Sequence, residues 1–230
     1  MSTVSSSTAM ASLVSSLADN KAALGRRYAD WAVSAPTLES AVAAAAMAQD
    51  ELGHARSTYP VLKALGTETD EVSGGDRRMA LLDSDLPDWN AFIAANLLVD
   101  GVLTTFVAAC VGSSVEQMAA RAKKILQEEG SHRVHGEAWA KRLCRGDQRD
   151  AFVARLEATW AEASRWLGPD DDPAYAAALE AGEIKQTAAH QRALIRDWLT
   201  AILAGEGVSI SLPDPSDWDG WDPERRRWTP

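Results

Sequence analysis

The sequence contains very little cysteine. Its 230 residues include only Cys110 and Cys144, which are too few for a disulfide framework and have no CxxC spacing. Cys110 lies in an apolar stretch and Cys144 near the end of a predicted helix, so both are predicted to be structural thiols. We therefore expect neither a redox dithiol nor a cysteine zinc site.

The chain also lacks an excess of positive charge. Its formal net charge is −10, and its basic clusters are short, such as Arg77-Arg78 and residues 225–227. Because this charge repels a phosphate backbone, nucleic acid is not an expected partner. No apolar run approaches the roughly 20 residues of a membrane span, and residues 1–10 lack the segments of a secretory signal. We therefore expect a cytoplasmic protein with no membrane partner.

Strand patterns are almost absent, whereas apolar residues recur at helical spacing. Four long helices are predicted, at about 13–31, 37–65, 88–111 and 114–143. A short loop at Ser34-Ala35-Pro36 follows the first helix, a long crossover at 67–87 follows the second, and Gly112 ends the third. Thr37 is predicted to cap the second helix, and Ser114-Val-Glu-Gln117 resembles a capping box for the fourth. This order of connections is typical of a ferritin-like bundle.

The predicted fold is all-α. We expect a single ferritin-like domain over residues 1–230, with a four-helix core at 12–144 and additional helices at 147–204. The last residues, 205–230, are rich in tryptophan and proline and predict an irregular tail. Since exposed tryptophans are costly, this tail is expected to wrap the bundle or to dock on a partner.

Two Glu-x-x-His motifs carry the predicted chemistry. Glu51 and His54 lie on the second helix, and Glu129 and His132 lie on the fourth. In an α-helix this spacing places a carboxylate and an imidazole on one face, where both can hold the same cation. Each motif alone is also consistent with a solvated helix face. The presence of two motifs on two core helices favours a metal site.

Asp100 adds a carboxylate at a similar depth in the bundle. It interrupts an otherwise apolar helix, where a lone buried acid costs several kcal/mol unless it is paired or binds a metal. An exposed Asp100 beside Gly101 is the alternative. A ligand set of carboxylates and imidazoles without thiolate suits iron or manganese better than structural zinc. Of the two, iron is the expected metal. The predicted metal ligands are therefore Glu51, His54, Asp100, Glu129 and His132.

Other titratable residues are given ordinary functions. His135 follows His132 by one helical turn, so it is either an outer neighbour of the site or an ordinary histidine. His190 is predicted to be structural. Tyr28 either lines the pocket or packs in the core.

The chain resembles the A/C subunit family of the multicomponent phenylacetyl-CoA epoxidase. The resemblance lies in Ala35-Pro-Thr-Leu38, Gln49-Asp-Glu-Leu-Gly-His-Ala-Arg56, Val99-Asp-Gly101 and Glu128-Glu-Gly-Ser-His132. It is good over about 12–145 and weaker to about 205, and it does not cover the tail. In this family the catalytic A subunit binds two irons and activates O2 with electrons from a reductase, whereas the C subunit is a structural partner with a degenerate site.

Lys21 separates these two possibilities. It lies about as far as Glu51 from the loop between the first two helices, roughly 20 Å at ~1.5 Å per residue, so the two should face each other. The resemblance implies a glutamate ligand at this position. The surrounding stretch, residues 17–22, is similar to the C kind, whereas the Glu-x-x-His motifs and Asp100 are similar to the A kind.

Several states of Lys21 are compatible with the sequence. The ammonium replaces one of two metal ions, or it loses its proton and becomes a ligand, or it pairs with the carboxylates in a site without metal. Alternatively, Lys21 extends to solvent and takes no part in the site.

We expect an iron-dependent oxygenase or oxidase that oxidises an organic substrate, aromatic or an acyl-CoA, with two irons per chain or one. Lys21 is its candidate catalytic residue. The expected partners are O2, the substrate, a reductase and a second subunit, identical or related. The alternative is a non-catalytic structural subunit. Iron storage is a distant third reading.

Overall fold

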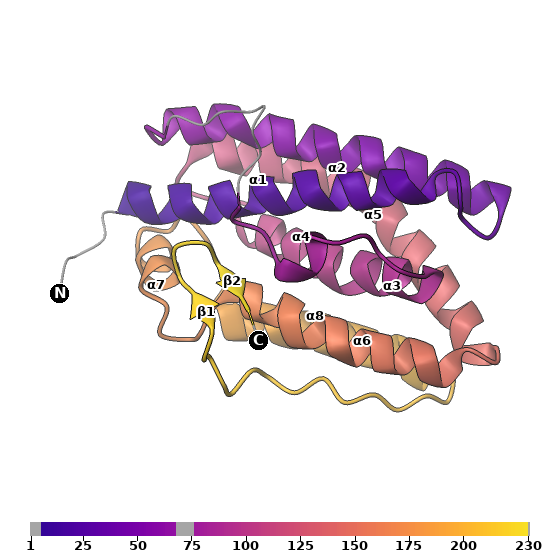
Figure 1. Ribbon diagram of the computed structural model, residues 1–230. Coiled ribbons are helices and arrows are strands. Elements are labelled where there is room, and N and C mark those ends of the chain that lie inside the picture. Colours follow the sequence, from indigo (N-terminus) through magenta and orange to yellow (C-terminus); the bar gives the residue numbers. More distant parts are fainter. Residues whose placement is uncertain (1–5, 68–75, 230) are drawn as a thin grey trace.

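The structure, a computed structural model, describes residues 6–67 and 76–229 and is an all-helical, ferritin-like bundle (Figure 1). The first hairpin pairs α1 with α2, and the second pairs a composite third helix with α5. These helices are α1 (Ser6–Trp31), α2 (Leu38–Ala64), α3 (Trp89–Ala94), the π-helix η2 (Ala95–Val99), α4 (Asp100–Ala109) and α5 (Glu116–Arg145). The predicted fold class is confirmed.

Helix ends match the predictions in one case and differ in another. Thr37 caps α2 as predicted, because its Oγ1 accepts a hydrogen bond from the Ser40 N–H at 3.2 Å. The predicted capping box of α5 is wrong. Its N-cap is Val115, which has no capping side chain, and the Ser114 hydroxyl instead donates to the Ala181 carbonyl at 3.0 Å.

The third helix corrects one expectation about hydropathy. Residues Trp89–Ala109 form a helix that is long and apolar enough to cross a membrane, contrary to the prediction that no such run exists. In this structure 78% of its most apolar window is buried inside the protein. Its apolar composition therefore follows from its position at the centre of the bundle, where it packs against several helices.

A second group of elements covers one side of the bundle. They are η1 (Ala80–Leu82), α6 (Arg149–Ala163), η3 (Ser164–Leu167), α7 (Pro173–Glu180), α8 (Ala188–Ala204), β1 (Trp221–Asp222) and β2 (Arg227–Trp228). The helices lie close to the predicted positions. Packing of α6 on α3 and of α8 on α4 and α5 leaves the third helix enclosed between two layers (Figure 1).

The tail wraps the bundle, which was one of the two arrangements predicted for it. The Trp160 indole on α6 donates to the Pro213 carbonyl at 2.7 Å. Further along, β1 and β2 form a small antiparallel hairpin, and Arg226 in its turn is 1% exposed. Arg226 donates to Asp172 Oδ2 at 2.5 Å and to the Trp166 carbonyl, so a buried ion pair holds the hairpin against the helices.

Candidate metal centre

A buried ammonium lies at the centre of the bundle. Lys21 on α1 is 0% exposed, and its three N–H donors all find carboxylates. Its Nζ donates to Glu51 Oε1 at 2.9 Å, Asp100 Oδ1 at 2.8 Å and Glu129 Oε1 at 2.6 Å. These three acids come from α2, α4 and α5. Each of the four core helices thus contributes one charged group to the same cluster.

This geometry removes two of the alternatives left by the sequence. Lys21 does not extend to solvent, and Asp100 does not lie on an exposed face, because their side chains are 1% and 2% exposed. Deprotonation of Lys21 is also disfavoured. Burial alone would lower its pKa, but the charges of Asp100, Glu129 and Glu51 outweigh burial and raise the pKa well above its ordinary value.

Close helix packing brings these groups together. A Cβ on Gly25, one turn after Lys21, would lie 3.1 Å from Glu51 Cβ and 2.9 Å from Leu52 Cγ, so glycine lets α1 and α2 approach. Gly136 on α5 has the same function against the π-helix, where a Cβ would meet Asn96 Oδ1 at 2.5 Å. The π-helix ends immediately before Asp100, and such segments are frequent at functional sites.

Four ligand-type side chains form a compact set. Ligand atoms of Glu51, Asp100, Glu129 and His132 all lie within 4.8 Å of one another and are buried. His54 is adjacent but outside this set, with its Nδ1 3.2 Å from Glu129 Oε1. The structure therefore brings all five predicted metal ligands, and Lys21, into one region.

Both histidines point the same ring nitrogen inward. His132 Nδ1 lies 2.9 Å from Asp100 Oδ2, and His54 Nδ1 faces Glu129. Their outer nitrogens meet other acids: His54 Nε2 is 2.8 Å from Glu128 Oε2, and His132 Nε2 is 3.3 Å from Asp50 Oδ2. Histidines that bind metals usually donate their outer N–H to a carboxylate, which fixes the inner lone pair toward the ion.

The outer acids are functional candidates that the sequence interpretation missed. Asp50 and Glu128 immediately precede the Glu of the two motifs, so each motif has the form acid-Glu-x-x-His. The pairing is crossed, because Asp50 on α2 serves His132 on α5 and Glu128 on α5 serves His54 on α2. The repeated acid was the available signal.

The acids differ in how readily they hold a proton. Burial, together with the charges of Glu129 and Glu51, raises the pKa of Asp100 to about 6 although Lys21 opposes the shift. Burial also favours the neutral form of Glu129, but Lys21 and the histidines outweigh it and hold its pKa well below the ordinary value. The cluster is thus strongly anionic apart from Lys21.

The histidines respond to this negative charge. Burial alone would lower the pKa of His54, but the Glu129 and Glu51 carboxylates beside its Nδ1 raise it to about 9. The pKa of His132 is raised as well, because Asp100, Glu129 and Glu51 outweigh burial. Lys21 balances one of the three inner carboxylates. A divalent cation, or protons on the two histidines, would balance the other two.

Two buried ligand-type atoms that make no hydrogen bond are suited to binding a cation. Among the described residues, Glu51 Oε2 and His54 Nδ1 are buried and make no hydrogen bond. Such atoms normally carry a desolvation cost of about 1–3 kcal/mol. The donor set of carboxylate oxygens and imidazole nitrogens, without thiolate, is the chemistry that iron and manganese accept. The residues therefore fit a bound divalent ion.

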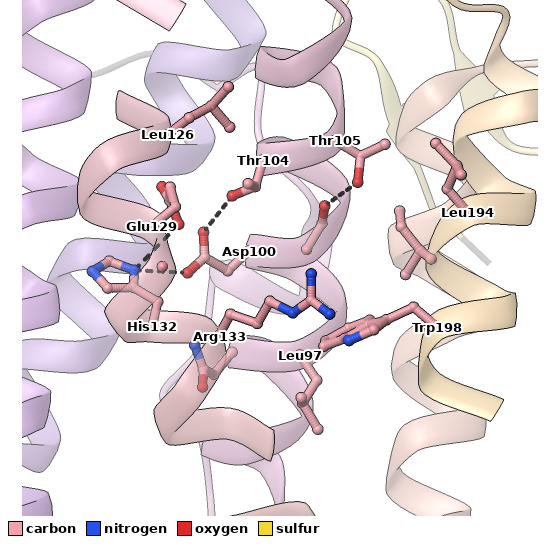
Figure 2. Close-up of a pocket in the computed structure, with 14 residues that line it drawn as sticks. Leu97, Asp100, Thr104, Thr105, Leu126, Glu129, His132, Arg133, Leu194 and Trp198 are labelled. Atoms are coloured by element: carbon pink, nitrogen blue, oxygen red, sulfur yellow. Dashed lines mark hydrogen bonds and ion pairs between the residues drawn. The ribbon is translucent and has the colours of Figure 1, made fainter. Parts of the chain in front are cut away.

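A cavity leads from the cluster toward α8. It has a volume of about 470 Å³ and is lined on one side by Asp100, Glu129 and His132. In Figure 2 these three residues lie on one side of the view, with Leu194 and Trp198 on the other and Arg133 beside Trp198. Such a space can hold a small organic molecule beside the cluster.

Three further titratable residues considered in the sequence, His135, Tyr28 and His190, are not part of the cluster. Both ring nitrogens of His135 are buried without a partner among the described residues, and its ring meets Trp89 and Phe92 edge-on. Burial lowers its pKa to about 4. Tyr28 is fully buried near His132, with ring centroids 6.5 Å apart, and His190 is exposed at the start of α8.

Comparison with known families identifies the chain. A family model described as phenylacetic acid catabolic protein matches residues 1–230. The chain belongs to this family. The match includes the tail, so the expectation that the resemblance stops near residue 205 was wrong. No curated protein matches the sequence.

Membership of the phenylacetic acid catabolic protein family supports an oxygenase-like role in phenylacetate catabolism and implies an enzyme subunit. It agrees with the buried cluster of carboxylates and histidine. The family is part of a multicomponent oxygenase complex, so partner subunits are expected. The chain has Lys21 at the position where the resemblance to the catalytic A kind implies a glutamate.

Proposed function

We propose that the chain is an oxygenase subunit of phenylacetate catabolism that holds one divalent iron beside the Lys21 ammonium. The inward Nδ1 atoms of His54 and His132, each backed by an outer carboxylate, are the observation that carries the proposal. Without a metal, neutral imidazoles would point lone pairs at the carboxylates, so this orientation would require both histidines to be protonated and to donate to the acids. With a metal, both histidines and the acids become ligands.

The position of Lys21 supports one ion rather than two. The resemblance alone implies two irons, but the ammonium already interacts with all three inner carboxylates. Two divalent ions beside a buried ammonium would exceed the charge of three carboxylates by two. Each close pair of like charges costs on the order of 4 kcal/mol at an effective dielectric constant near 20. One divalent ion leaves the inner site neutral.

The chain's own residues would bind the metal and orient the substrate. Glu51, His54, Asp100, Glu129 and His132 would hold the ion, and Lys21 would fix the inner carboxylates in one orientation. The cavity would place an aromatic acyl substrate beside the cluster and exclude water. When bound, iron supplies the reaction with O2, with electrons from a reductase. We also propose a cytoplasmic location and a second subunit, identical or related.

Anaerobic loading with Fe(II), followed by metal analysis, tests this proposal. We expect one iron per chain in the natural protein and loss of that iron in the double variant His54→Ala/His132→Ala. Lys21→Glu should raise the content toward two, because it restores the carboxylate that the resemblance implies. Absence of bound iron in the natural protein would refute the proposal, whether or not Lys21→Glu binds iron.

A structural subunit without metal is the second candidate function. The complete use of the three Lys21 donors favours it, because the ammonium by itself ties four helices together. This candidate predicts that the natural protein binds no iron and that a related chain supplies the oxygenase activity. Iron content and co-purification with a related subunit therefore separate the two candidates.

A further inference from the structure

A continuous series of aromatic rings connects the candidate metal centre with the surface. We call it the aromatic chain: Tyr28, Phe92, Trp89, Trp31 and Trp139. It begins at His132, whose ring centroid is 6.5 Å from that of Tyr28. From Tyr28 the next centroid, that of Phe92, is 5.0 Å away, and Phe92 stacks on Trp89 at 4.3 Å with an interplanar angle of 9°.

The aromatic chain divides at Trp89 and reaches solvent. Trp31 and Trp139 lie 5.4 and 5.2 Å from Trp89, and all three tryptophans are partly exposed, whereas Tyr28 and Phe92 are fully buried. The rings come from α1, α3 and α5, so three helices build the series. No step between consecutive rings exceeds the 6.5 Å that separates His132 from Tyr28.

We propose that the aromatic chain conducts oxidising equivalents from the metal centre to the surface. This inference rests on the proposed function, because only a redox-active centre generates such equivalents. Indole rings are much easier to oxidise than to reduce, so a series of tryptophans conducts electrons inward to a strong oxidant. It would protect the site when O2 reacts without substrate.

The electron balance is simple. The Trp89 indole would give one electron to the oxidised centre, and Trp31 or Trp139 would then reduce the Trp89 radical cation. The resulting surface radical cation takes an electron from a thiolate in solution, which becomes a thiyl radical. No bond to a ring forms.

Proton positions indicate which rings are stopping points. Within the described residues, the Tyr28 hydroxyl is buried with only the Asn96 amide close by, and an amide is too weak a base to receive the phenol proton on oxidation. Tyr28 and Phe92 therefore act as bridges. An indole can be oxidised while it keeps its proton, which agrees with the buried, unpartnered Trp89 N–H. Trp89 is the first stopping point.

The protein offers a selective attachment site for a photo-oxidant near Trp139. The Arg142 guanidinium stacks over Trp139 at 4.6 Å from the ring centroid, and both natural cysteines are buried. A ruthenium polypyridyl complex on an Arg142→Cys variant would therefore sit beside the outer end of the aromatic chain. A flash with an oxidative quencher converts it to Ru(III), which then takes an electron from the protein.

With Fe(II) bound, as metal analysis would verify, the centre should reduce Ru(III) through the aromatic chain. Trp89→Phe keeps a packed ring that resists oxidation, so the reduction of Ru(III) by iron should become several-fold slower. Trp160→Phe alters a buried indole on α6 outside the aromatic chain and should leave the rate unchanged. Equal rates in the ruthenium-labelled Arg142→Cys protein with and without Trp89→Phe, with iron bound in both, would overturn the inference.

The metal-free protein provides a readout that does not depend on the proposed function. There the flash should produce an indole radical cation shared between Trp139 and Trp89. Trp89→Phe should confine it to Trp139, and the change in the hyperfine pattern of its electron paramagnetic resonance spectrum would reveal the migration. Absence of iron binding combined with this migration would refute the proposed function, while showing that the rings themselves conduct. Absence of migration would count against the aromatic chain whatever the iron content.

Discussion

Replacing Lys21 with methionine would remove the ammonium and keep a side chain of comparable length. The three carboxylates that it contacts at 2.6–2.9 Å would then lie together without their common partner. Breaking a fully buried ion pair by removing one partner costs about 3–5 kcal/mol. We expect Lys21→Met to lower the free energy of unfolding by this amount at pH 7.5 in the presence of a chelator.

Two further conditions sharpen this prediction. Acidification should reduce the loss, because the pKa of Asp100 is already raised to about 6 and a proton can replace the missing ammonium. A divalent cation should also restore stability, by about 2.7 kcal/mol at one hundred times its dissociation constant. Both effects follow from charge compensation and not from packing.

Urea denaturation followed by circular dichroism measures these quantities. Lys63→Met is the matched control, because Lys63 lies exposed on α2 and should cost within ±0.5 kcal/mol. A loss below about 1 kcal/mol for Lys21→Met, the range of exposed ion pairs, would refute the assignment of Lys21 as the charge centre of the bundle.

Four other predictions concern the outer acids, the histidines and the tail. Asp50→Asn and Glu128→Gln should each weaken Co(II) binding, followed by its visible absorption, by about 10–100-fold; unchanged affinity would contradict the crossed arrangement. Because the raised pKa values of the histidines favour protonation, the metal must displace protons, and its affinity should rise as the pH increases from about 6.5 toward the His54 pKa of about 9. In the metal-free protein, the stabilisation from protonated His54 should be complete below about pH 6.5 and disappear as the pH passes about 9, as denaturation across this range would reveal. Arg226→Met should cost about 3–5 kcal/mol in thermal or urea unfolding, because it leaves Asp172 buried without its partner; an unchanged midpoint would show that the hairpin does not stabilise the fold.

Much of the fold followed from local sequence patterns. The helical periodicity, the Thr37 cap and the long crossover were sufficient to predict the bundle and its order of connections. The predicted Ser114 cap was wrong because the hydroxyl has a tertiary partner, the Ala181 carbonyl, which local sequence does not reveal. The small hairpin in the tail depends on the buried Arg226–Asp172 pair, which joins residues far apart in the chain.

The repeated Glu-x-x-His motifs of the candidate site could be predicted from the sequence. Contacts that depend on how the helices pack against one another could not. The Glu-x-x-His spacing identified both motifs, and equal distance from a loop placed Lys21 opposite Glu51. The sequence could not decide whether Lys21 faces inward, because a lysine can extend past its own helix to solvent. The pairing of Asp50 with His132 depends on the relative rotation of α2 and α5, which only the packed structure provides.

The crossed pairing of the outer acids also depends on the position of α2 along α5. Each acid lies beside a ligand of its own helix but serves the histidine of the other helix. A slip of α2 along α5 by one turn, about 5.4 Å, would therefore separate both pairs at once. Correct assembly of the site and correct register of the bundle are consequently the same event, so an error in helix alignment cannot leave a functional centre behind.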